Sequence, residues 1–217
     1  MSAHKINIAE IRKDYQLAAL DEATAGDDPL IFFGKWLAEA EAAQISEVNA
    51  MTLATVDAFS KPHARIVLLK GLDDQGFVFY TNYSSAKGAE LDSHPFAALV
   101  FFWKELERQV RVEGAIIRAS DAESDQYFNS RPEGSRLGAW ASPQSQVIPT
   151  RDVLDDNYKK YQAKFDGTSI PRPEHWGGYK LIPASIEFWQ GRSNRMHDRI
   201  AFKRTKVSVW EKNRLAP

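Results

Sequence analysis

The chain has no cysteine among its 217 residues. This absence excludes disulfide bonds, thiolate zinc sites, iron–sulfur clusters and cysteine nucleophiles, and it is typical of proteins from a reducing compartment. Long hydrophobic runs are missing as well: the longest spans residues 96–103, whereas a membrane-spanning helix needs ~20 apolar residues. The N-terminal residues contain no apolar signal segment. We therefore expect a cytoplasmic protein.

An excess of charge of either sign is also lacking, because 28 Lys and Arg residues face 29 Asp and Glu residues, which gives a net charge of −1. Such a balance creates no long-range field that would attract nucleic acid or an anionic membrane. Any site for an anion must therefore be local. Hydrophobic residues make up 43 % of the chain, which is enough for a packed core and argues against global disorder.

The common motifs of nucleotide and metal chemistry are absent. The sequence contains neither G-x-x-x-x-G-K-[ST] nor G-x-G-x-x-G, which disfavours a P-loop or a Rossmann site. It has no H-E-x-x-H motif and its five histidines are scattered, so we expect no metal site. A G-x-S-x-G nucleophile elbow is missing too, which disfavours an α/β-hydrolase.

Hydrophobic periodicity predicts a helical N-terminal region followed by a sheet. Residues 4–47 show helical spacing that is broken at residues 26–29, where Asp28 can cap a second helix beginning at Pro29. Short β-rich or alternating runs predict strands over residues 51–56, 63–70, 77–81, 96–103, 109–114, 185–189, 200–203 and 207–210. Further helices are predicted over residues 85–93, 121–130 and 150–165.

Strands in hairpin order with short helices between them are typical of an antiparallel barrel with helical additions. The chain shows no internal repeat and no long linker. We therefore expect a single, mainly β domain over residues 1–217, with an N-terminal helical arm over residues 1–48 and a barrel with inserted helices over residues 49–217.

Basic residues gather at four places where chemistry is possible. In the first, Arg65 and Lys70 bracket an apolar strand, and such a strand can hold an anion at each end. In the second, residues 80–87, hydroxyl groups and Lys87 lie at a strand-to-helix junction, where main-chain N–H groups can bind phosphate. Solvated strand ends and an ordinary serine cap are the structural alternatives.

The third and fourth places are denser in donors. Tyr127 and Arg131 lie four residues apart at a predicted helix end, with Ser135 just beyond, and these three donors suit a phosphate dianion. Residues 187–199 hold three Arg, one His and one Trp, a density of like charge that favours an anionic or electron-rich ligand. A helix C-cap at Arg131 and ion pairs to the acidic residues within 187–199 are the structural alternatives.

Seven short motifs occur in order along the chain: RIVLLK (65–70), FYTN (79–82), LERQV (106–110), SRP (130–132), GAW (138–140), IEFWQG (186–191) and HDR (197–199). Together they resemble the pyridoxamine/pyridoxine 5′-phosphate oxidase family, FMN enzymes of vitamin B6 metabolism. The similarity extends from Arg12 to Pro217, nearly the whole chain. The resemblance implies an FMN-binding split β-barrel with C-terminal dimerisation strands, acting as a homodimer with two flavins at the subunit interface.

The resemblance also implies roles for individual residues. Those that match FMN-binding positions, in part contributed by the other subunit, are Arg65, Ile66, Val67, Leu68, Leu69, Lys70, Tyr80, Thr81, Lys87, Gln109, Gln144, Ser145, Trp189 and Arg199. Those that match substrate-binding positions are Arg12, Tyr15, Lys70, Tyr127, Arg131, Ser135, Arg195, Met196 and His197. Arg12 and Tyr15 match a segment that covers the site in such enzymes.

The implied reaction converts pyridoxamine or pyridoxine 5′-phosphate to pyridoxal 5′-phosphate. This oxidation removes two electrons, and FMN is the acceptor that amino-acid side chains lack. We expect hydride to pass to the flavin and O2 to reoxidise it, giving H2O2. Arg195 and His197 are the expected catalytic residues, which orient the substrate and assist proton removal.

Three other functions remain as alternatives. A non-catalytic flavin- or pyridoxal-phosphate-binding split-barrel protein would use the same barrel as a carrier, and a split-barrel reductase would act on other substrates. An OB-like nucleic-acid barrel is disfavoured because the chain lacks a basic net charge. The expected partners are therefore small molecules and a second copy of the chain, with neither nucleic acid nor membrane.

Overall fold

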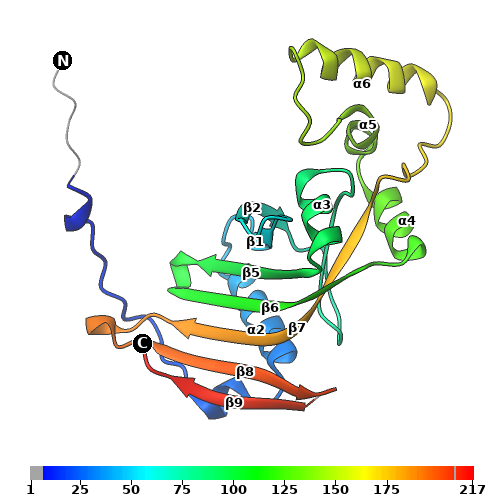
Figure 1. Ribbon diagram of the computed structural model, residues 1–217. Coiled ribbons are helices and arrows are strands. Elements are labelled where there is room, and N and C mark those ends of the chain that lie inside the picture. The colour runs from blue at the N-terminus through cyan, green and yellow to red at the C-terminus, as the bar shows by residue number, and fades with distance from the viewer. Residues whose placement is uncertain (1–6, 208) are drawn as a thin grey trace, which may run out of the picture.

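An antiparallel sheet of nine strands forms the body of the protein (Figure 1). The computed structural model describes residues 7–207 and 209–217. The strand order is β2-β1-β5-β6-β7-β4-β3, and β8 and β9 continue from β7. The strands are β1 Ala50–Val56, β2 Pro62–Leu68, β3 Gly71–Leu72, β4 Phe77–Asn82, β5 Phe96–Trp103, β6 Arg108–Arg118, β7 Trp176–Gln190, β8 Asp198–Lys206 and β9 Val209–Leu215.

Strand β7 changes its pairing partner half-way along. One of its edges pairs with β6 over residues 179–190, while the other pairs with β4 over residues 176–181 and with β8 over residues 185–190. The β6–β7 register shifts next to Gly114, where a Cβ atom would collide with the carbonyl oxygen of Ile182. Glycine permits this close approach, and the sheet divides there into two parts that share β7.

Helix α2 (Pro29–Ala42) is part of the hydrophobic core. It begins as predicted, because the Asp28 side chain caps it by accepting hydrogen bonds from two main-chain N–H groups. Phe33 is fully buried and packs edge-on against Phe77 and Phe101, with ring centroids 4.9 Å away in both cases. Helix α2 therefore packs into the hydrophobic core together with the strands of the sheet. It does not form the separate arm that was expected.

Three of the helices lie near one end of β7, and the N-terminal segment lies near the other end (Figure 1). Helices α4 Asp121–Ser130, α5 Glu133–Ala141 and α6 Asp152–Lys164 gather near its start, around the apolar cluster of Phe128, Leu137, Ile170 and Trp176. The N-terminal segment passes its far end. The remaining short elements are η1 Ile8–Glu10, α1 Glu22–Ala25, α3 Ala86–Ser93, η2 Lys104–Leu106 and η3 Ser193–Arg195. None of the helices in the described part of the chain is both long and apolar enough to cross a bilayer.

The predicted antiparallel, mainly β fold with inserted helices is confirmed, but the elements differ in three respects. Residues 11–21 have no regular secondary structure instead of the predicted helix, because their main chain bonds to the barrel. Helix α5 and the first half of β7 were not predicted, since α5 carries Gly134 and Gly138 and β7 carries Gly177, Gly178 and Pro183. Residues 4–6 of the predicted helix and residue 208 of the last predicted strand lie outside the described residues.

Replacing Phe33 with Ala is expected to lower the free energy of unfolding by ~3–5 kcal/mol, because the change removes buried apolar surface and leaves a cavity. Ile31 lies on the same helix but is 74 % exposed, so Ile31→Ala should change that free energy by less than about 0.5 kcal/mol. Chemical denaturation of both variants measures the difference. Equal effects at the two positions would mean that α2 is only attached to the barrel.

Candidate active site

A cleft of about 500 Å³ opens where β2 and β4 face the helices α4 and α5. Eleven of the residues singled out in the sequence line it: Ile66, Val67, Leu68, Lys70, Tyr80, Thr81, Lys87, Tyr127, Arg131, Ser135 and Gln144. Among the described residues that form its wall there is no Asp or Glu. The cleft therefore combines apolar surface with uncompensated positive charge, as a site for an anionic ligand requires.

Arg131 is the clearest indication that the cleft binds a ligand. It follows the last turn of α4, and its guanidinium lies 4.6 Å from the ring centre of Trp176. Its Nη1 atom is buried and has no hydrogen-bond partner among the described residues. Burial lowers the pKa of Arg131, and nearby Tyr127 offsets this only in part. A buried donor without an acceptor is costly, so an anion that accepts this hydrogen bond would be bound strongly.

Three aromatic rings form the wall beside Arg131. Tyr80 stacks on Tyr127 with ring centroids 4.0 Å apart and on Trp176 at 5.6 Å. The interplanar angles are 20° and 10°, respectively. Since the rings come from β4, α4 and β7, the stack joins the helices to the sheet. It fixes the position of the Tyr127 ring, and Tyr127 lines the cleft.

Lys87 lies in the first turn of α3, a helix that is capped by the Ser85 side chain. The Lys87 Nζ atom donates to Ser85 Oγ (3.2 Å) and to Gln144 Oε1 (3.1 Å). Burial, and secondarily the charge of Arg65, lower the pKa of Lys87. A helix N-terminus and a lysine at one place both favour a bound anion.

Arg65 lies behind the cleft wall instead of lining it. Its guanidinium donates to Glu90 Oε2 (2.8 Å) and to the Thr55 hydroxyl, which itself donates to Glu90. Burial alone would raise the pKa of Glu90, but the hydrogen bonds from Thr55 and Arg65 outweigh it, so the pKa is lowered. The buried carboxylate thus holds Arg65 in place near Lys87.

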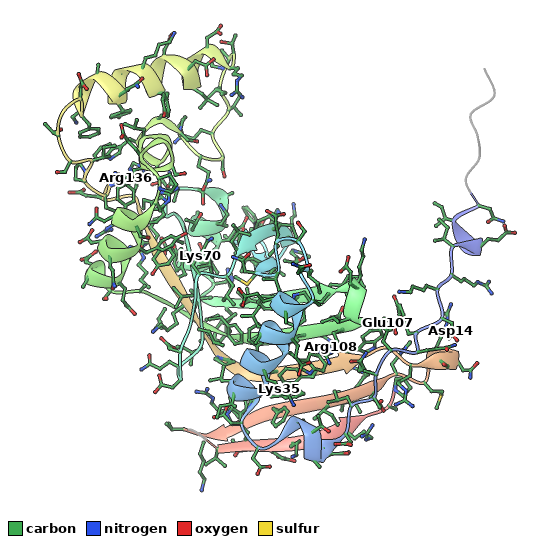
Figure 2. All side chains as sticks on the ribbon, turned by 180° about the vertical axis from the view of Figure 1, so that it is seen from behind. Asp14, Lys35, Lys70, Glu107, Arg108 and Arg136 are labelled. Atoms are coloured by element: carbon green, nitrogen blue, oxygen red, sulfur yellow. The ribbon has the colours of Figure 1, made fainter. Side chains whose placement is uncertain are left out.

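A second hollow, of about 580 Å³, lies at the other end of β7. It brings together four of the predicted residues, Arg12, Tyr15, Arg195 and His197, with Lys13, Asp14, Arg192 and Asn194. Figure 2 shows Asp14 and Glu107 at this end of the molecule, whereas Lys70 and Arg136 lie toward the end that carries α4–α6. The predicted residues therefore form two separate groups within one chain.

The hydrogen bonding of His197 defines what this side chain offers a ligand. Its Nδ1 atom accepts a hydrogen bond from the main-chain N–H of Arg192 (3.1 Å). A main-chain amide can only donate, so Nδ1 keeps its lone pair and the proton of the neutral ring lies on Nε2. The ring then presents a donor and not a base. This geometry favours the expected orienting role of His197 and disfavours the expected part in proton removal.

Arg195 occupies a strained turn. It and Asn194 have φ values of 61° and 55°, in the left-handed region that non-glycine residues rarely adopt. Two such residues in succession cost on the order of 1–3 kcal/mol each. The turn aims the Arg195 side chain into the second hollow, and strain of this kind is concentrated at functional sites.

Leu69 and Ser145, which were also expected to bind FMN, lie outside the cleft. Leu69 is 5 % exposed and belongs to the core, because strand alternation directs its side chain away from the face that Leu68 and Lys70 share. Ser145 is exposed next to Gln144 and has a φ of 69°. The expected contacts of these two side chains with a ligand in the cleft are therefore not supported within one chain.

Gln109, Trp189 and Arg199 lie near the second hollow. They are neighbours across three adjacent strands, since Gln109 pairs with Trp189 and Trp189 with Arg199. The Trp189 ring lies 4.6 Å from His197. Arg199 donates to both carboxylate oxygens of Glu187, at 2.8 and 3.1 Å, as the ion-pair alternative predicted. Met196, in the same turn as His197, is 68 % exposed and lies beside the hollow.

Sequence reasoning assigned no role to five residues that line the cleft: Asn82, Gly138, Ala139, Ser142 and Trp176. Three of them lie within the motifs 79–82 and 138–140, which were the available signal. Trp176 belongs to the part of β7 that was not predicted. Across residues 7–207 and 209–217, no group of three or more His, Asp or Glu side chains could hold a metal ion.

Known families match nearly the whole chain. The family profile described as pyridoxamine 5′-phosphate oxidase matches residues 37–165, and the profile described as the pyridoxine 5′-phosphate oxidase C-terminal dimerisation region matches residues 176–217. A relative from Cupriavidus necator, named pyridoxine/pyridoxamine 5′-phosphate oxidase, is 55 % identical over 97 % of this chain and 99 % of its own. A relative of the same name from Leptospira interrogans is 54 % identical over 97 % and 98 %.

Solved structures with the same fold extend the comparison. PhzG from Burkholderia lata, in complex with tetrahydrophenazine-1-carboxylic acid, has a TM-score of 0.86 and 28 % identity and covers 93 % of this chain and 99 % of its own. An FMN-binding, pyridoxamine 5′-phosphate oxidase-related protein from Nostoc punctiforme has a TM-score of 0.68 and 16 % identity over 88 % and 98 %. The second likeness concerns the fold alone, which is that of the split barrel.

Replacing Glu90 with Gln is expected to lower the free energy of unfolding at neutral pH by about 1–3 kcal/mol, because Arg65 loses a buried charged acceptor. The pKa of Glu90 lies below its ordinary value of 4.5 in the folded protein. Ionisation of Glu90 therefore contributes stability above pH 4.5, and this contribution is lost as the pH falls through the folded pKa. Unfolding measured at several pH values should show a difference between wild type and variant that shrinks below about pH 4.5.

The control for this experiment is Glu41→Gln, at an exposed position near the end of α2. Its stability should follow that of the wild type at every pH. A deficit in Glu90→Gln that stayed constant down to pH 3 would contradict an ionised Glu90.

Proposed function

This chain belongs to the pyridoxamine 5′-phosphate oxidase family, and from that membership we propose that it oxidises pyridoxamine 5′-phosphate and pyridoxine 5′-phosphate to pyridoxal 5′-phosphate with FMN as cofactor. The observation that carries the proposal is the cleft with no acidic residue in its described wall, where Lys70, Lys87 and the unpaired Arg131 surround an aromatic stack. Flat aromatic molecules that carry a phosphate are the ligands suited to such a wall.

The cleft fits FMN in size and in chemistry. Its volume of about 500 Å³ lies within the roughly 300–1,000 Å³ typical of cofactor sites. The proposed FMN-binding residues are Arg65, Ile66, Val67, Leu68, Tyr80, Thr81, Lys87 and Gln144. Lys87, at the N-terminus of α3, and Arg65 behind it would hold the FMN phosphate. When bound, FMN supplies the two-electron acceptor that side chains lack.

A second phosphate subsite is proposed for the substrate. Lys70, Tyr127, Arg131 and Ser135 line the same cleft, and the Nη1 atom of Arg131 is a buried donor without an acceptor among the described residues. A phosphate that occupies this subsite lies away from the carbon that is oxidised. Its binding free energy would therefore orient the reacting end of the substrate.

The second group of predicted residues is too distant to act on the same ligand in one chain. Trp176 and Gln190 mark the two ends of β7, which is 15 residues long, and at 3.3 Å per residue these ends lie on the order of 40 Å apart. We therefore propose a homodimer in which the second hollow of each subunit meets the cleft of its partner. Arg195 and His197 would then reach the substrate across the interface.

An apolar surface on the sheet supports the proposed dimer. An apolar hollow of about 690 Å³ is lined by residues of β1, β2, β5, β6, β7 and β8. Part of its wall, including Ala201 and Phe202, lies within the region matched to dimerisation. Phe96 on its rim is 65 % exposed. Contiguous exposed apolar surface of this kind typically marks a protein interface.

Arg195 and His197 are proposed to orient the substrate and to stabilise charge. The Nε2–H of His197 donates to the substrate, and the Arg195 guanidinium adds a positive charge that favours loss of a proton from the substrate amine or hydroxyl. O2 is the proposed final acceptor. With the amine, one O2 and one H2O are consumed, and one pyridoxal 5′-phosphate, one NH3 and one H2O2 are formed.

Adding pyridoxamine 5′-phosphate to the purified, FMN-loaded protein in air is expected to give H2O2 and pyridoxal 5′-phosphate in equal amounts. A carrier protein would bind the ligand and release neither.

Arg131→Ala should raise KM for pyridoxamine 5′-phosphate about 10–100-fold with FMN still bound, because one charge-assisted contact to the phosphate is lost. Arg151→Ala, at a position with a side chain 82 % exposed, is the control and should leave KM unchanged.

A mixed dimer tests whether the site is shared between subunits. Arg131→Ala and Arg195→Leu are introduced into separate chains that carry different tags, and the doubly tagged heterodimer is purified after co-expression. Each variant homodimer should be nearly inactive at low substrate concentration. The heterodimer should regain about half of the wild-type activity, because one of its two sites is intact. An inactive heterodimer would show that each subunit builds its own site.

A further inference from the structure

Glu107 is a buried carboxylate outside both hollows. It lies in the turn between β5 and β6, its side chain is 3 % exposed and its φ is 55°. A left-handed conformation is unfavourable for a residue with a Cβ atom, and a buried charge is tolerated only when it is well paired. The turn therefore keeps Glu107 in a position that the local sequence alone does not favour.

The carboxylate of Glu107 bonds to the N-terminal segment. Its Oε2 atom accepts hydrogen bonds from the main-chain N–H groups of Gln16 (2.8 Å) and Leu17 (3.1 Å). Its Oε1 atom lies 3.3 Å from Lys13 Nζ. Residues 11–21 form no helix or strand, so these contacts take the place of the main-chain pairing that secondary structure would supply.

The main chain of Glu107 bonds to the other side of the second hollow. Its carbonyl oxygen accepts from the N–H of Gly191 (2.7 Å) and from Gln190 Nε2 (3.2 Å). These residues begin the turn that leads to Arg195 and His197. One residue thus joins the covering segment to the turn that it covers.

Tyr15 completes this contact. A Cβ atom on Gly191 would lie 2.7 Å from the Tyr15 ring, so the ring packs directly on the Gly191 main chain. The ring centre lies 5.8 Å from Trp189 and 6.1 Å from His197. Farther along the segment, the N–H of Leu20 donates to the Asp198 carboxylate (3.1 Å). The segment is therefore held on both sides of residues 18–19.

We propose that Glu107 is a positioning residue that holds residues 12–17 closed over the Arg195–His197 half of the site. The proposal rests on the proposed function, because that function defines the half-site that is covered. Without the carboxylate, the two main-chain N–H groups lose a charged acceptor and Lys13 loses its counter-charge. The segment would then open more often and leave Arg12 and Tyr15 out of place.

The test uses Glu107→Gln in the full-length, FMN-loaded protein, with Glu105→Gln as the matched control. Glu105 lies in the same turn, and its side chain is 51 % exposed and pairs only loosely with Lys104, at 3.7 Å. Trypsin cleavage after Arg12 and Lys13, located by mass spectrometry, reports opening of the segment. Cleavage should be about 10-fold or more faster in Glu107→Gln than in the wild type or the control.

Steady-state kinetics provide the second readout. We expect KM for pyridoxamine 5′-phosphate to rise about 10-fold in Glu107→Gln, with bound FMN and the unfolding midpoint near those of Glu105→Gln. A purely structural role would instead lower the midpoint and the FMN content together. Wild-type rates of cleavage in Glu107→Gln would overturn the proposal. Absence of H2O2 from the wild type would overturn the proposed function alone, because cleavage is measured without turnover.

A second variant reaches the same contact by another route. Gly191→Ala displaces the Tyr15 ring but leaves the Glu107 carboxylate intact. If Glu107→Gln fails to fold, faster trypsin cleavage in Gly191→Ala supports the closed segment. Unchanged cleavage in that variant overturns it.

Discussion

The structure depends on the way in which β7 pairs with its neighbours. A strand that keeps one partner on one edge and exchanges β4 for β8 on the other fixes two sheets to a single rod of main chain. The cleft forms at the start of β7, beside the end of β4, and the second hollow forms where β8 joins the end of β7. Because a paired β-strand is stiff, the distance between the two groups of functional residues is fixed. Binding a ligand cannot close that distance within one chain, which is why the proposed site draws on residues of a second subunit.

The positive charge of the cleft arises from where the charged residues lie and not from the net charge of the chain. Acidic residues are absent from the described wall of the cleft, and yet the net charge of the chain is −1. Two carboxylates pair with arginines near the cleft and the second hollow: Glu90 with Arg65, and Glu187 with Arg199. A carboxylate in that place fixes the direction of a guanidinium but leaves the wall of the cleft free of negative charge. Electrostatic preorganisation of this kind needs no net charge.

The sequence was sufficient for much of the fold, for identifiable reasons. Alternating or β-rich runs predicted segments of β1, β2, β4, β5, β6, β8 and the second half of β7, since each carries either a two-residue alternation or a short run rich in β-branched and aromatic residues. The predicted bounds of α4, residues 121–130, agree with the structure, where Ser120 and Glu123 form a capping box. The first half of β7 was not predicted, because its sequence contains glycines and resembles a loop. These glycines are required by the tertiary structure, since they approach Tyr80 and Tyr83 closely. The helix predicted over residues 11–21 was wrong, because the hydrogen-bond acceptor of this segment lies some ninety positions away in the sequence.

The candidate site, like the fold, has one part that the local sequence predicts and another part that depends on distant contacts. Motifs identified most of the residues that line the cleft, because those residues lie in short continuous strings such as FYTN and SRP. They did not identify which nitrogen of His197 faces a ligand, since that is decided by a main-chain amide five residues earlier. Nor did they distinguish Glu107 from its exposed neighbour Glu105, although both belong to one turn. Residues that touch a ligand leave a local signature, whereas residues that hold those residues in place acquire their role from distant parts of the chain. Three-dimensional contacts are therefore required to find the second class.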